Sequence, residues 1–469
     1  MNTNPMNFED DQAILDLIAA YEASLEQGSE VFFEEKIYLQ LIEYYEHEDQ
    51  PERALQATEY AIRNHSYSAD FYLKKAQLLI DNHQNAQAIS MLEQANLIFP
   101  GAPAIGLLKA EALANMGLHE EALALLNEMK TGANAAITSN ILVCESVVYE
   151  IMEEYERTFY ALKAALMENP KNTDALERIW FAVEIAKKYK ESIELHQYIL
   201  EEDPYSHLGW YNLGHSHAYL GNYNEAIEAY EFAFVINEKF EFAYRDCAEI
   251  CFEIKQYQKA LNCYLEIAEH FEPDSELFLS IGQCYQHLEN YKTARNYYHR
   301  ALDMDSMSDE VLFHLGCCYA AEGKWKSAIR AYIQAIRIEN EREEYYAALG
   351  EAYAEIGERT KAETNFKKAI DVAPDQSQYW LQYTSFLIET DRVEAALEVL
   401  QEANDYAEGT ELLYCRIACL FAINRRQEAL YWLGEALEED FDMHYLLFEV
   451  MPDLKQDADV EKLIISYSA

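Results

Sequence analysis

The stretch WYNLGHSHAYLGNYNEAIEAY, residues 210–230, contains a His-Ser-His triplet inside an apolar pattern, and it decides how the whole chain is interpreted. One helical face, at the spacing i, i+3, i+4, i+7, is formed by Trp210, Leu213, Gly214 and His217. Gly221 and Asn222 interrupt this pattern, and a second face follows from Ala226 to Ala233. The stretch therefore predicts two helices joined by a tight turn.

The same pattern recurs every 34 residues. An aromatic or leucine column is formed by Trp210, Tyr244, Phe278, Leu312, Tyr346, Trp380 and Tyr414. An alanine column is formed by Ala226, Ala260, Ala294, Ala328, Ala362 and Ala396. Twelve units are expected to begin near Glu35, Ala69, Pro103, Ser139, Thr173, His207, Glu241, Ser275, Asp309, Glu343, Ser377 and Glu411. Catalytic motifs do not repeat in this way, whereas structural units do.

A single hairpin of this kind cannot bury both of its apolar faces, so neighbouring units must stack to complete the core. The unit resembles the tetratricopeptide repeat (TPR), and the best copy contains Trp210, Leu213, Gly214, Ala226, Tyr230 and Ala233. The resemblance, which is to multi-repeat TPR proteins of bacterial type, implies an all-α fold. That fold is a right-handed solenoid of about twelve helix hairpins, with the first helices lining its concave side.

The expected organisation has a helical cap at each end. Residues 1–34 are interpreted as an N-terminal cap built on a helix from Phe8 to Leu25, and residues 35–136 as units one to three. Residues 139–444 are interpreted as units four to twelve, the last with a turn one residue shorter, and residues 445–469 as a C-terminal cap. Asp459 is expected to cap a short helix there. The stretch from Gly132 to Thr138 is a candidate hinge or a longer loop.

The chain has 84 acidic and 36 basic side chains among 469 residues, which gives a formal net charge of −48. A polyanion is repelled by phosphate backbones, so nucleic acids and direct membrane insertion are excluded as partners, and basic proteins are favoured. The first residues lack the features of a signal peptide, no apolar run is long enough to span a membrane, and nine cysteines form no disulfide framework. These features predict a cytoplasmic protein.

Known TPR proteins bind partners through a stripe on the first helices, and the resemblance carries that stripe over to this chain. The expected groove residues are Glu177, Phe181, Tyr211, His215, Phe242, Arg245, Glu249, Phe252, Gln283 and Phe313. Aromatic rings interleaved with carboxylates suit a protein or peptide segment with apolar anchors or basic flanks. The Lys-Asn-Arg clamp that one TPR subgroup uses for C-terminal carboxylates is not preserved, since Glu177 and Phe181 replace its first residues.

The histidines and cysteines do not form a metal or catalytic site. His215 and His217 lie about 200° apart on a helix, so they cannot bind one ion together. Cys247 and Cys251 fall in packing columns, while Cys415 and Cys419 fall in groove columns of the last unit. No nucleotide-binding, zinc-protease or nucleophile motif occurs, so no cofactor, metal or catalytic residue is expected.

Three functions remain open at this point. The favoured one is a non-catalytic scaffold or adaptor that arranges partner segments in the groove. The second is an acidic, chaperone-like holder of basic client proteins, whose affinity should fall steeply with salt. The third, more remote, is an enzyme hidden in the degenerate fourth and fifth units. Self-association through an end of the solenoid or an acidic face also remains open.

Overall fold

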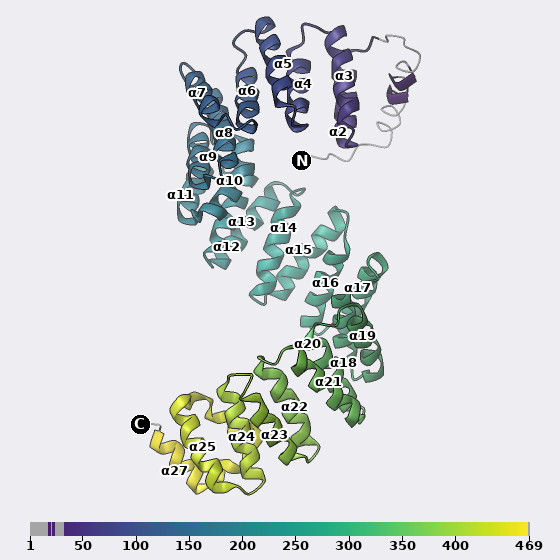
Figure 1. Cartoon of the computed structure of the whole chain (residues 1–469), viewed down its shortest axis with the longest axis vertical. Helices are drawn as coiled ribbons and strands as arrows, with labels where there is room; N and C mark the ends of the chain where they lie inside the picture. Colours follow the sequence, from purple (N-terminus) through teal and green to yellow (C-terminus); the bar gives the residue numbers. More distant parts are fainter. Residues whose placement is uncertain (1–16, 20, 24–31, 468–469) are drawn as a thin grey trace. The chain divides into compact units, whose positions relative to one another are not determined.

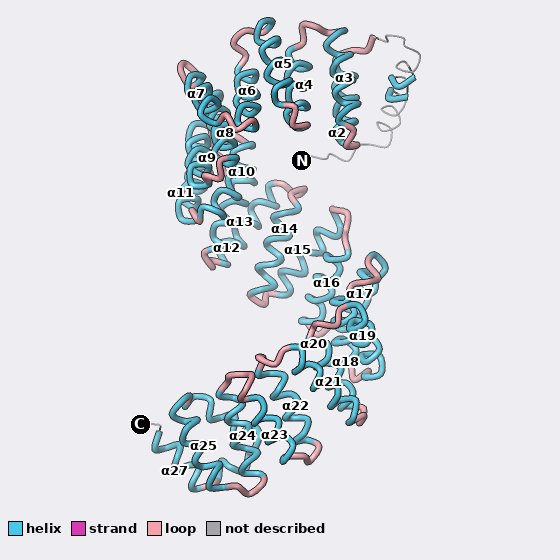
Figure 2. The backbone as a smooth tube through the Cα atoms, in the orientation of Figure 1, coloured by secondary structure: helices cyan, strands magenta, loops and turns pink. Residues whose placement is uncertain are grey.

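The computed structural model describes residues 17–19, 21–23 and 32–467, and within these ranges the chain is helical and contains no strand. Figure 2 shows helices joined by short loops. The chain divides into two compact units, Met1–Ala243 and Tyr244–Ala469, which are described separately here.

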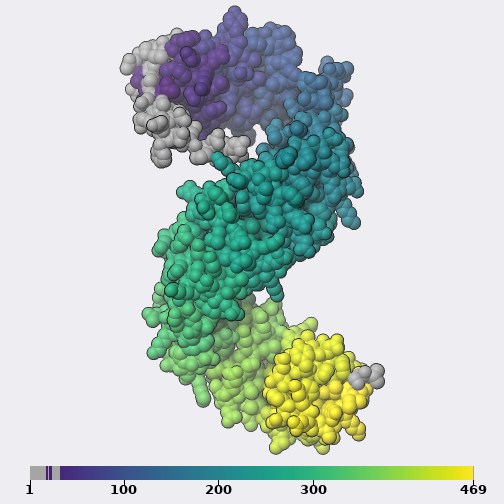
Figure 3. All heavy atoms as spheres, turned by 180° about the vertical axis from the view of Figure 1, so that it is seen from behind, coloured from purple at the N-terminus to yellow at the C-terminus, as the bar shows by residue number. Residues whose placement is uncertain are grey.

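Each unit is a row of helix pairs. The first contains α2 (Glu35–His47), α3 (Pro51–Asn64), α4 (Ala69–Asp81), α5 (Asn85–Ile98), α6 (Pro103–Asn115), α7 (His119–Met129), α8 (Ala135–Ile151), α9 (Tyr155–Glu168), α10 (Thr173–Ala186), α11 (Tyr189–Glu202), α12 (His207–Tyr219) and α13 (Tyr223–Ile236). The second contains α14 (Glu241–Glu253), which begins just before the boundary, α15 (Tyr257–His270), α16 (Ser275–His287), α17 (Tyr291–Met304), α18 (Asp309–Ala321), α19 (Trp325–Ile338), α20 (Glu343–Glu355), α21 (Arg359–Val372), α22 (Ser377–Glu389), α23 (Val393–Ala403), α24 (Thr410–Ala422) and α25 (Arg426–Glu439). Within each unit, colours follow the chain from one pair to the next (Figures 1 and 3), as expected where repeats contact their chain neighbours.

The described residues therefore form twelve successive helix pairs, which confirms the predicted all-α solenoid of TPR hairpins. Two first helices depart from the expected starts. Helix α8 begins at Ala135 rather than near Ser139, so most of the candidate hinge is helical and the connection before it covers residues 130–134. Helix α24 begins at Thr410, one residue early, and α25 follows after the usual spacing. The missing residue thus lies before α24 and not in the turn of the last pair, contrary to the prediction.

Each hairpin turn contains one residue in the left-handed region, which reverses the chain after the first helix. These residues are Asp49, His83, Gly117, Glu153, Lys187, Gly221, Lys255, Glu289, Gly323, Gly357, Asp391 and Asn424. A side chain in this conformation places Cβ against the backbone, and glycine avoids that cost. Only four of the twelve turns use glycine, so the other eight hold local strain.

Replacing Glu289 by glycine is expected to stabilise the second unit by roughly 0.5–1 kcal/mol, because Glu289 has φ of 59° in the exposed turn between α16 and α17. The measurement is the urea midpoint of unfolding. The control is Glu289→Gln, which removes the same charge but keeps the strained Cβ. Equal midpoints for the two variants would show that charge, and not backbone strain, controls stability at this turn.

Close packing inside four of the central helix pairs depends on a glycine that faces a large ring. A Cβ added at Gly214 on α12 would lie 2.8 Å from the ring of Tyr230 on α13. Gly282, Gly316 and Gly350 face Tyr298, Tyr332 and Phe366 in the same way. The rings are buried, and the alanine columns are also fully buried. The small residues therefore let the two helices approach, and the rings fill the remaining core.

Short apolar segments cover the N-terminal end of the first unit and the C-terminal end of the second. Ile18 and Tyr21 are buried against the first hairpin, and we propose that they cap it; the remainder of the predicted Phe8–Leu25 helix lies outside the described residues. At the other end, η1 (Phe441–His444), α26 (Tyr445–Val450), η2 (Pro452–Gln456) and α27 (Ala458–Tyr467) cover α24 and α25.

The last helix is capped by a different residue from the one expected. Asp457, not Asp459, accepts the backbone N–H groups at the start of α27, because α27 begins at Ala458 and Asp459 already lies in its first turn. Arg426 donates hydrogen bonds to the carboxylates of Asp457 and Asp459. Its hydrogen bond to Asp457 lowers the pKa of that carboxyl group to about 2.

Candidate functional site

The predicted groove residues lie on five first helices. Glu177 and Phe181 are on α10, Tyr211 and His215 on α12, Phe242, Arg245, Glu249 and Phe252 on α14, Gln283 on α16 and Phe313 on α18. In the first unit, ring contacts through Trp180 bring Phe181, His215 and Tyr211 together, and Glu177 lies one turn before Phe181 on α10. The structure places Gln283 near Phe313 in the second unit, where both contact neighbouring repeats.

In the first unit, the stretch ERIWFAVE, residues 177–184, places two rings between two carboxylates on one face of α10. At 3.6 residues per turn, Glu177, Phe181 and Glu184 share this face with Trp180. Trp180 is 39% exposed and Phe181 is 36% exposed. Ile185 of the same helix is 41% exposed, so α10 presents three large apolar side chains to solvent, while Leu176, Ile179 and Val183 are buried.

These rings continue onto α12. Trp180 contacts the ring of His215, with centroids 5.8 Å apart, and His215 contacts Tyr211 and Tyr219. Tyr219 is 48% exposed and stacks on Tyr189 of α11. We call Trp180, Phe181, Tyr211, His215 and Tyr219 the α10–α12 aromatic surface. It joins two adjacent first helices and presents apolar area to solvent.

Trp180 was not expected at this surface. It occupies the position that Gly214 has in the next pair, where glycine faces the buried ring of Tyr230. The position of Tyr230 is taken by His196, a smaller residue that is fully buried. In this pair the first helix therefore carries the large residue, whereas in the next pair the second helix carries it. The available sequence signal was the pairing of Trp180 with His196, where the next five units pair glycine or alanine with tyrosine or phenylalanine.

The two carboxylates beside these rings have no cationic partner. Neither Glu177 nor Glu184 forms an ion pair within the part of the chain that the structure describes. Glu184 is only half-exposed and lies close enough to His215 and Tyr189 to influence their pKa values. Burial lowers the pKa of His215, against the opposing effect of Glu184, so the imidazole is neutral near pH 7.

Phe240 links the α10–α12 aromatic surface to the start of α14. Its ring lies 5.0 Å from that of Tyr211 and 5.9 Å from that of Phe242. Phe242 is 66% exposed, which makes it one of the most exposed rings of the first unit. Tyr211 is less accessible, because it also packs on Tyr230. Of the predicted residues, Phe181 and Phe242 therefore offer the most free ring area.

The predicted residues on α14 that belong to the second unit form a mixed surface. Arg245 forms an ion pair with Asp274, with 3.8 Å between nitrogen and oxygen. Burial raises the pKa of Glu249, although Arg245 opposes this effect. Phe252 packs against the rings of Tyr257 and His287. Charged residues and an aromatic ring alternate along this part of α14, but the ring of Phe252 is already packed against other residues of the chain.

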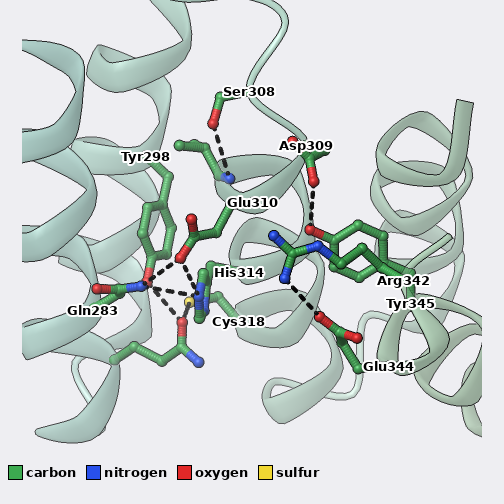
Figure 4. Close-up of polar contacts among 12 residues, drawn as sticks. Gln283, Tyr298, Ser308, Asp309, Glu310, His314, Cys318, Arg342, Glu344 and Tyr345 are labelled. Carbon is green, nitrogen blue, oxygen red and sulfur yellow. Dashed lines mark hydrogen bonds and ion pairs between the residues drawn. The ribbon is translucent and has the colours of Figure 1, made fainter. Parts of the chain in front are cut away.

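Gln283 and Phe313 both contact neighbouring repeats of the second unit, and Figure 4 shows the contacts of Gln283. The Gln283 amide donates to Nε2 of His314 at 3.0 Å and contacts Glu310 at 3.3 Å. Phe313 packs on Tyr345, with centroids 4.7 Å apart. His314 lowers the pKa of Glu310. The hydrogen bonds of Gln283 to His314 and Glu310 connect α16 with α18. Gln283 and Phe313 thus hold repeats together, which leaves less of either for a partner.

The other histidine and cysteine candidates from the sequence, His217 and four cysteines, lie in turn or packing positions. His217 contacts Asn222 in its own hairpin turn, and Cys247 and Cys251 are buried. Cys415 and Cys419 are also buried, 5% and 1% exposed, so their predicted groove position is wrong. The early start of α24 turns both thiols into the core. Within the described residues, no group of three histidine, cysteine or acidic side chains is placed to hold a metal ion.

A separate cavity of about 620 Å³ lies between α5, α6, α7 and α8. It occurs where α7 is short and the following connection departs from the 34-residue period. Its wall is mainly apolar, with Leu92, Ile105 and Met129 among its members, and the Lys109–Glu93 ion pair also lines it. It does not include any predicted groove residue.

Twelve consecutive helix hairpins, the central ones with a glycine facing a buried ring and most with a fully buried alanine in the second helix, define a TPR solenoid. Residues 157–411, more than half of the chain, match the family described as Cilia and flagella-associated protein 70 C-terminal domain, a TPR region. The chain therefore belongs to this family. Residues 77–205 match the family described as Psidin, N-terminal TPR repeats region.

Solved structures show similarity at low identity. YrrB, a TPR protein with an unusual peptide-binding site, is 22% identical, and the match covers 39% of this chain and 95% of that one, with a TM-score of 0.34. MamA from Desulfovibrio magneticus RS-1 is 19% identical over 35% of this chain and 94% of that one, with a TM-score of 0.33. A chain in an APC/C hetero-tetramer is 14% identical over 93% and 96%, with a TM-score of 0.35. No curated protein matches the sequence.

None of the described helices combines the length and the apolar character that crossing a membrane requires.

Proposed function

We propose that this protein is a non-catalytic scaffold that binds segments of partner proteins on its first helices. The observation that carries the proposal is the α10–α12 aromatic surface, where Trp180 and Phe181 are exposed side by side. Aromatic side chains contribute much of the binding energy at protein interfaces, because they bury a large area with little loss of conformational entropy. Membership of a TPR family supports the same role.

The partner segment is proposed to carry apolar anchors and basic flanking residues. The apolar anchors would pack on Trp180 and Phe181, and the basic residues would approach Glu177 and Glu184, which have no ion-pair partner in the described part of the chain. The net charge of −48 favours the encounter with basic proteins over long distances. The proposed binding residues in this unit are Glu177, Phe181, Tyr211, His215 and Phe242, with Trp180 and Glu184 added from the structure.

The scaffold role predicts that Trp180→Ala combined with Phe181→Ala reduces capture of partner proteins from the native cell lysate by roughly tenfold or more, because two aromatic anchors are removed. Quantitative mass spectrometry of proteins retained on the immobilised full chain measures this. The matched control is Tyr205→Ala with Phe232→Ala, which removes two exposed rings of the same unit, one in the loop after α11 and one on α13. An equal loss of captured partner proteins in both double variants would contradict a binding surface at α10–α12.

The net charge also favours a second function, the acidic holder of basic clients. In that case capture should fall steeply between low salt and about 0.5 M salt, where the Debye length is well below 10 Å, and should not depend on Trp180 or Phe181. Capture that survives salt but is lost in the double variant supports the scaffold. The reverse result supports the holder.

A further inference from the structure

The half-buried carboxylate of Glu184 lies among aromatic rings that belong to three helices. Trp180 is one turn before it on α10, and a position four residues away on a helix is a direct neighbour. His215 on α12 and Tyr189 on α11 are close enough to Glu184 that its charge influences both of them. Tyr189 in turn stacks on Tyr219, with centroids 4.9 Å apart. The carboxylate therefore lies one turn from the exposed ring of Trp180 and close to the half-buried rings of His215 and Tyr189.

This arrangement leaves a charge without compensation. Half-burial removes part of the water that would stabilise the Glu184 carboxylate, and no cationic side chain of the described chain pairs with it. Glu249, another predicted groove carboxylate, does have a cationic neighbour, since it lies near Arg245. A site that keeps an unpaired carboxylate beside exposed rings is suited to a cation that comes from another molecule.

The chemistry of the surrounding groups selects among cations. A guanidinium is planar, so one face can stack on an aromatic ring while its edge donates two hydrogen bonds to a carboxylate. An ammonium group has no flat face and holds its water more strongly. The neutral imidazole of His215 adds no positive charge that would repel either of them.

We propose that Glu184 and Trp180 form a binding site for one arginine side chain of a partner protein, with the guanidinium on the indole of Trp180 and its edge on the Glu184 carboxylate. The inference rests on the proposed scaffold function, because the arginine is taken to belong to the segment that binds the α10–α12 aromatic surface. It narrows the partner from a basic segment to one with an arginine next to an apolar anchor.

The test uses the full chain and a fluorescein-labelled decapeptide that contains one arginine next to one leucine among glycine and serine residues. Two matched peptides carry lysine or citrulline in place of the arginine, and citrulline keeps the shape of arginine without its charge. Fluorescence anisotropy measures the dissociation constants. The arginine peptide is expected to bind about tenfold more tightly than the citrulline peptide, and more tightly than the lysine peptide.

Two variants locate the effect. Glu184→Gln should weaken the arginine peptide about tenfold and leave the citrulline peptide unchanged. Glu194→Gln removes the same charge from an exposed position on α11 and should change neither peptide by more than about twofold. Trp180→Leu should reduce the preference for arginine over lysine, because it removes the flat surface for stacking.

Several results would overturn the arginine site. These are equal affinities for arginine and citrulline, equal effects of Glu184→Gln and Glu194→Gln, or no binding of the arginine peptide at millimolar concentration. If the peptides bind, lose affinity in the Trp180→Ala, Phe181→Ala variant and ignore Glu184→Gln, the scaffold function stands and only the arginine site is wrong. Far-ultraviolet circular dichroism of each variant confirms that its helices are intact.

Discussion

The Gly316→Ala variant should unfold at a clearly lower urea concentration than the parent chain, with a loss of about 2 kcal/mol in the free energy of unfolding. A Cβ at this position in α18 would lie 2.6 Å from Cδ1 of Tyr332, which is 2% exposed and has no space to move into. Overpacking of this kind costs about 1–3 kcal/mol, which outweighs the gain of up to about 1 kcal/mol from replacing glycine in a helix.

The matched control is Gly434→Ala in α25, where the added Cβ would meet only the hydroxyl of Tyr467 at 3.5 Å. This variant should gain up to about 1 kcal/mol from helix propensity alone, so the two substitutions are expected to have opposite signs. Urea titrations followed by circular dichroism measure both. If Gly316→Ala stabilised the chain as much as Gly434→Ala does, the close approach of α18 to Tyr332 would be disproved.

Acid should destabilise the first unit through His196, by about 3 kcal/mol between pH 6.5 and pH 4. This imidazole is fully buried, and burial lowers its pKa to about 4. Nδ1 lies 2.8 Å from the carbonyl oxygen of Ser192, while Nε2 has no partner among the described residues. The unfolded chain takes up a proton near pH 6.5 and the folded chain only near pH 4, so stability falls as the pH drops between these values.

The measurement is the free energy of unfolding of the parent chain and of His196→Gln at several pH values from 7.5 to 4. The variant cannot titrate at this position, so its stability should decline less steeply, whatever its absolute stability at pH 7. His299→Gln replaces an exposed histidine of α17 and should keep the slope of the parent chain. Parallel curves for the parent and His196→Gln would show that the imidazole is not kept neutral by the fold.

The architecture was predictable because the sequence repeats the same local requirement many times. A small residue at Gly214, an alanine at Ala226 and a ring at Tyr230 each recur at 34-residue intervals, and only a stack of hairpins satisfies all three. The departures occur where one unit differs in length from its neighbours. The 34-residue spacing alone did not show that the missing residue precedes Thr410. A deletion of one residue before α24 and a deletion of one residue after it leave the alanines of α25 at the same positions.

The proposed binding surface was predicted only in part, for a physical reason. The stripe that contains Phe181, Tyr211 and His215 was implied by the resemblance to TPR proteins, and the structure places these residues together. Trp180 was missed because its column is normally buried, and whether a large residue there turns outward depends on the residue opposite it. Gln283 and Phe313 lie on the same stripe in another repeat, yet they contact His314 and Tyr345, contacts that no repeat pattern specifies.

In the α10–α11 hairpin the large residue, Trp180, is on the first helix and the smaller one, His196, is on the second, the reverse of the next hairpin. This reversal suggests how repeat chains diversify. A duplicated hairpin that swaps a small and a large residue between its two helices keeps its length and its helix ends, so its neighbours still fit against it. One pair of substitutions then converts a buried ring into a surface ring without an insertion. A repeat array thus holds many sites at which a new recognition surface can evolve one hairpin at a time, while the rest of the array keeps its sequence.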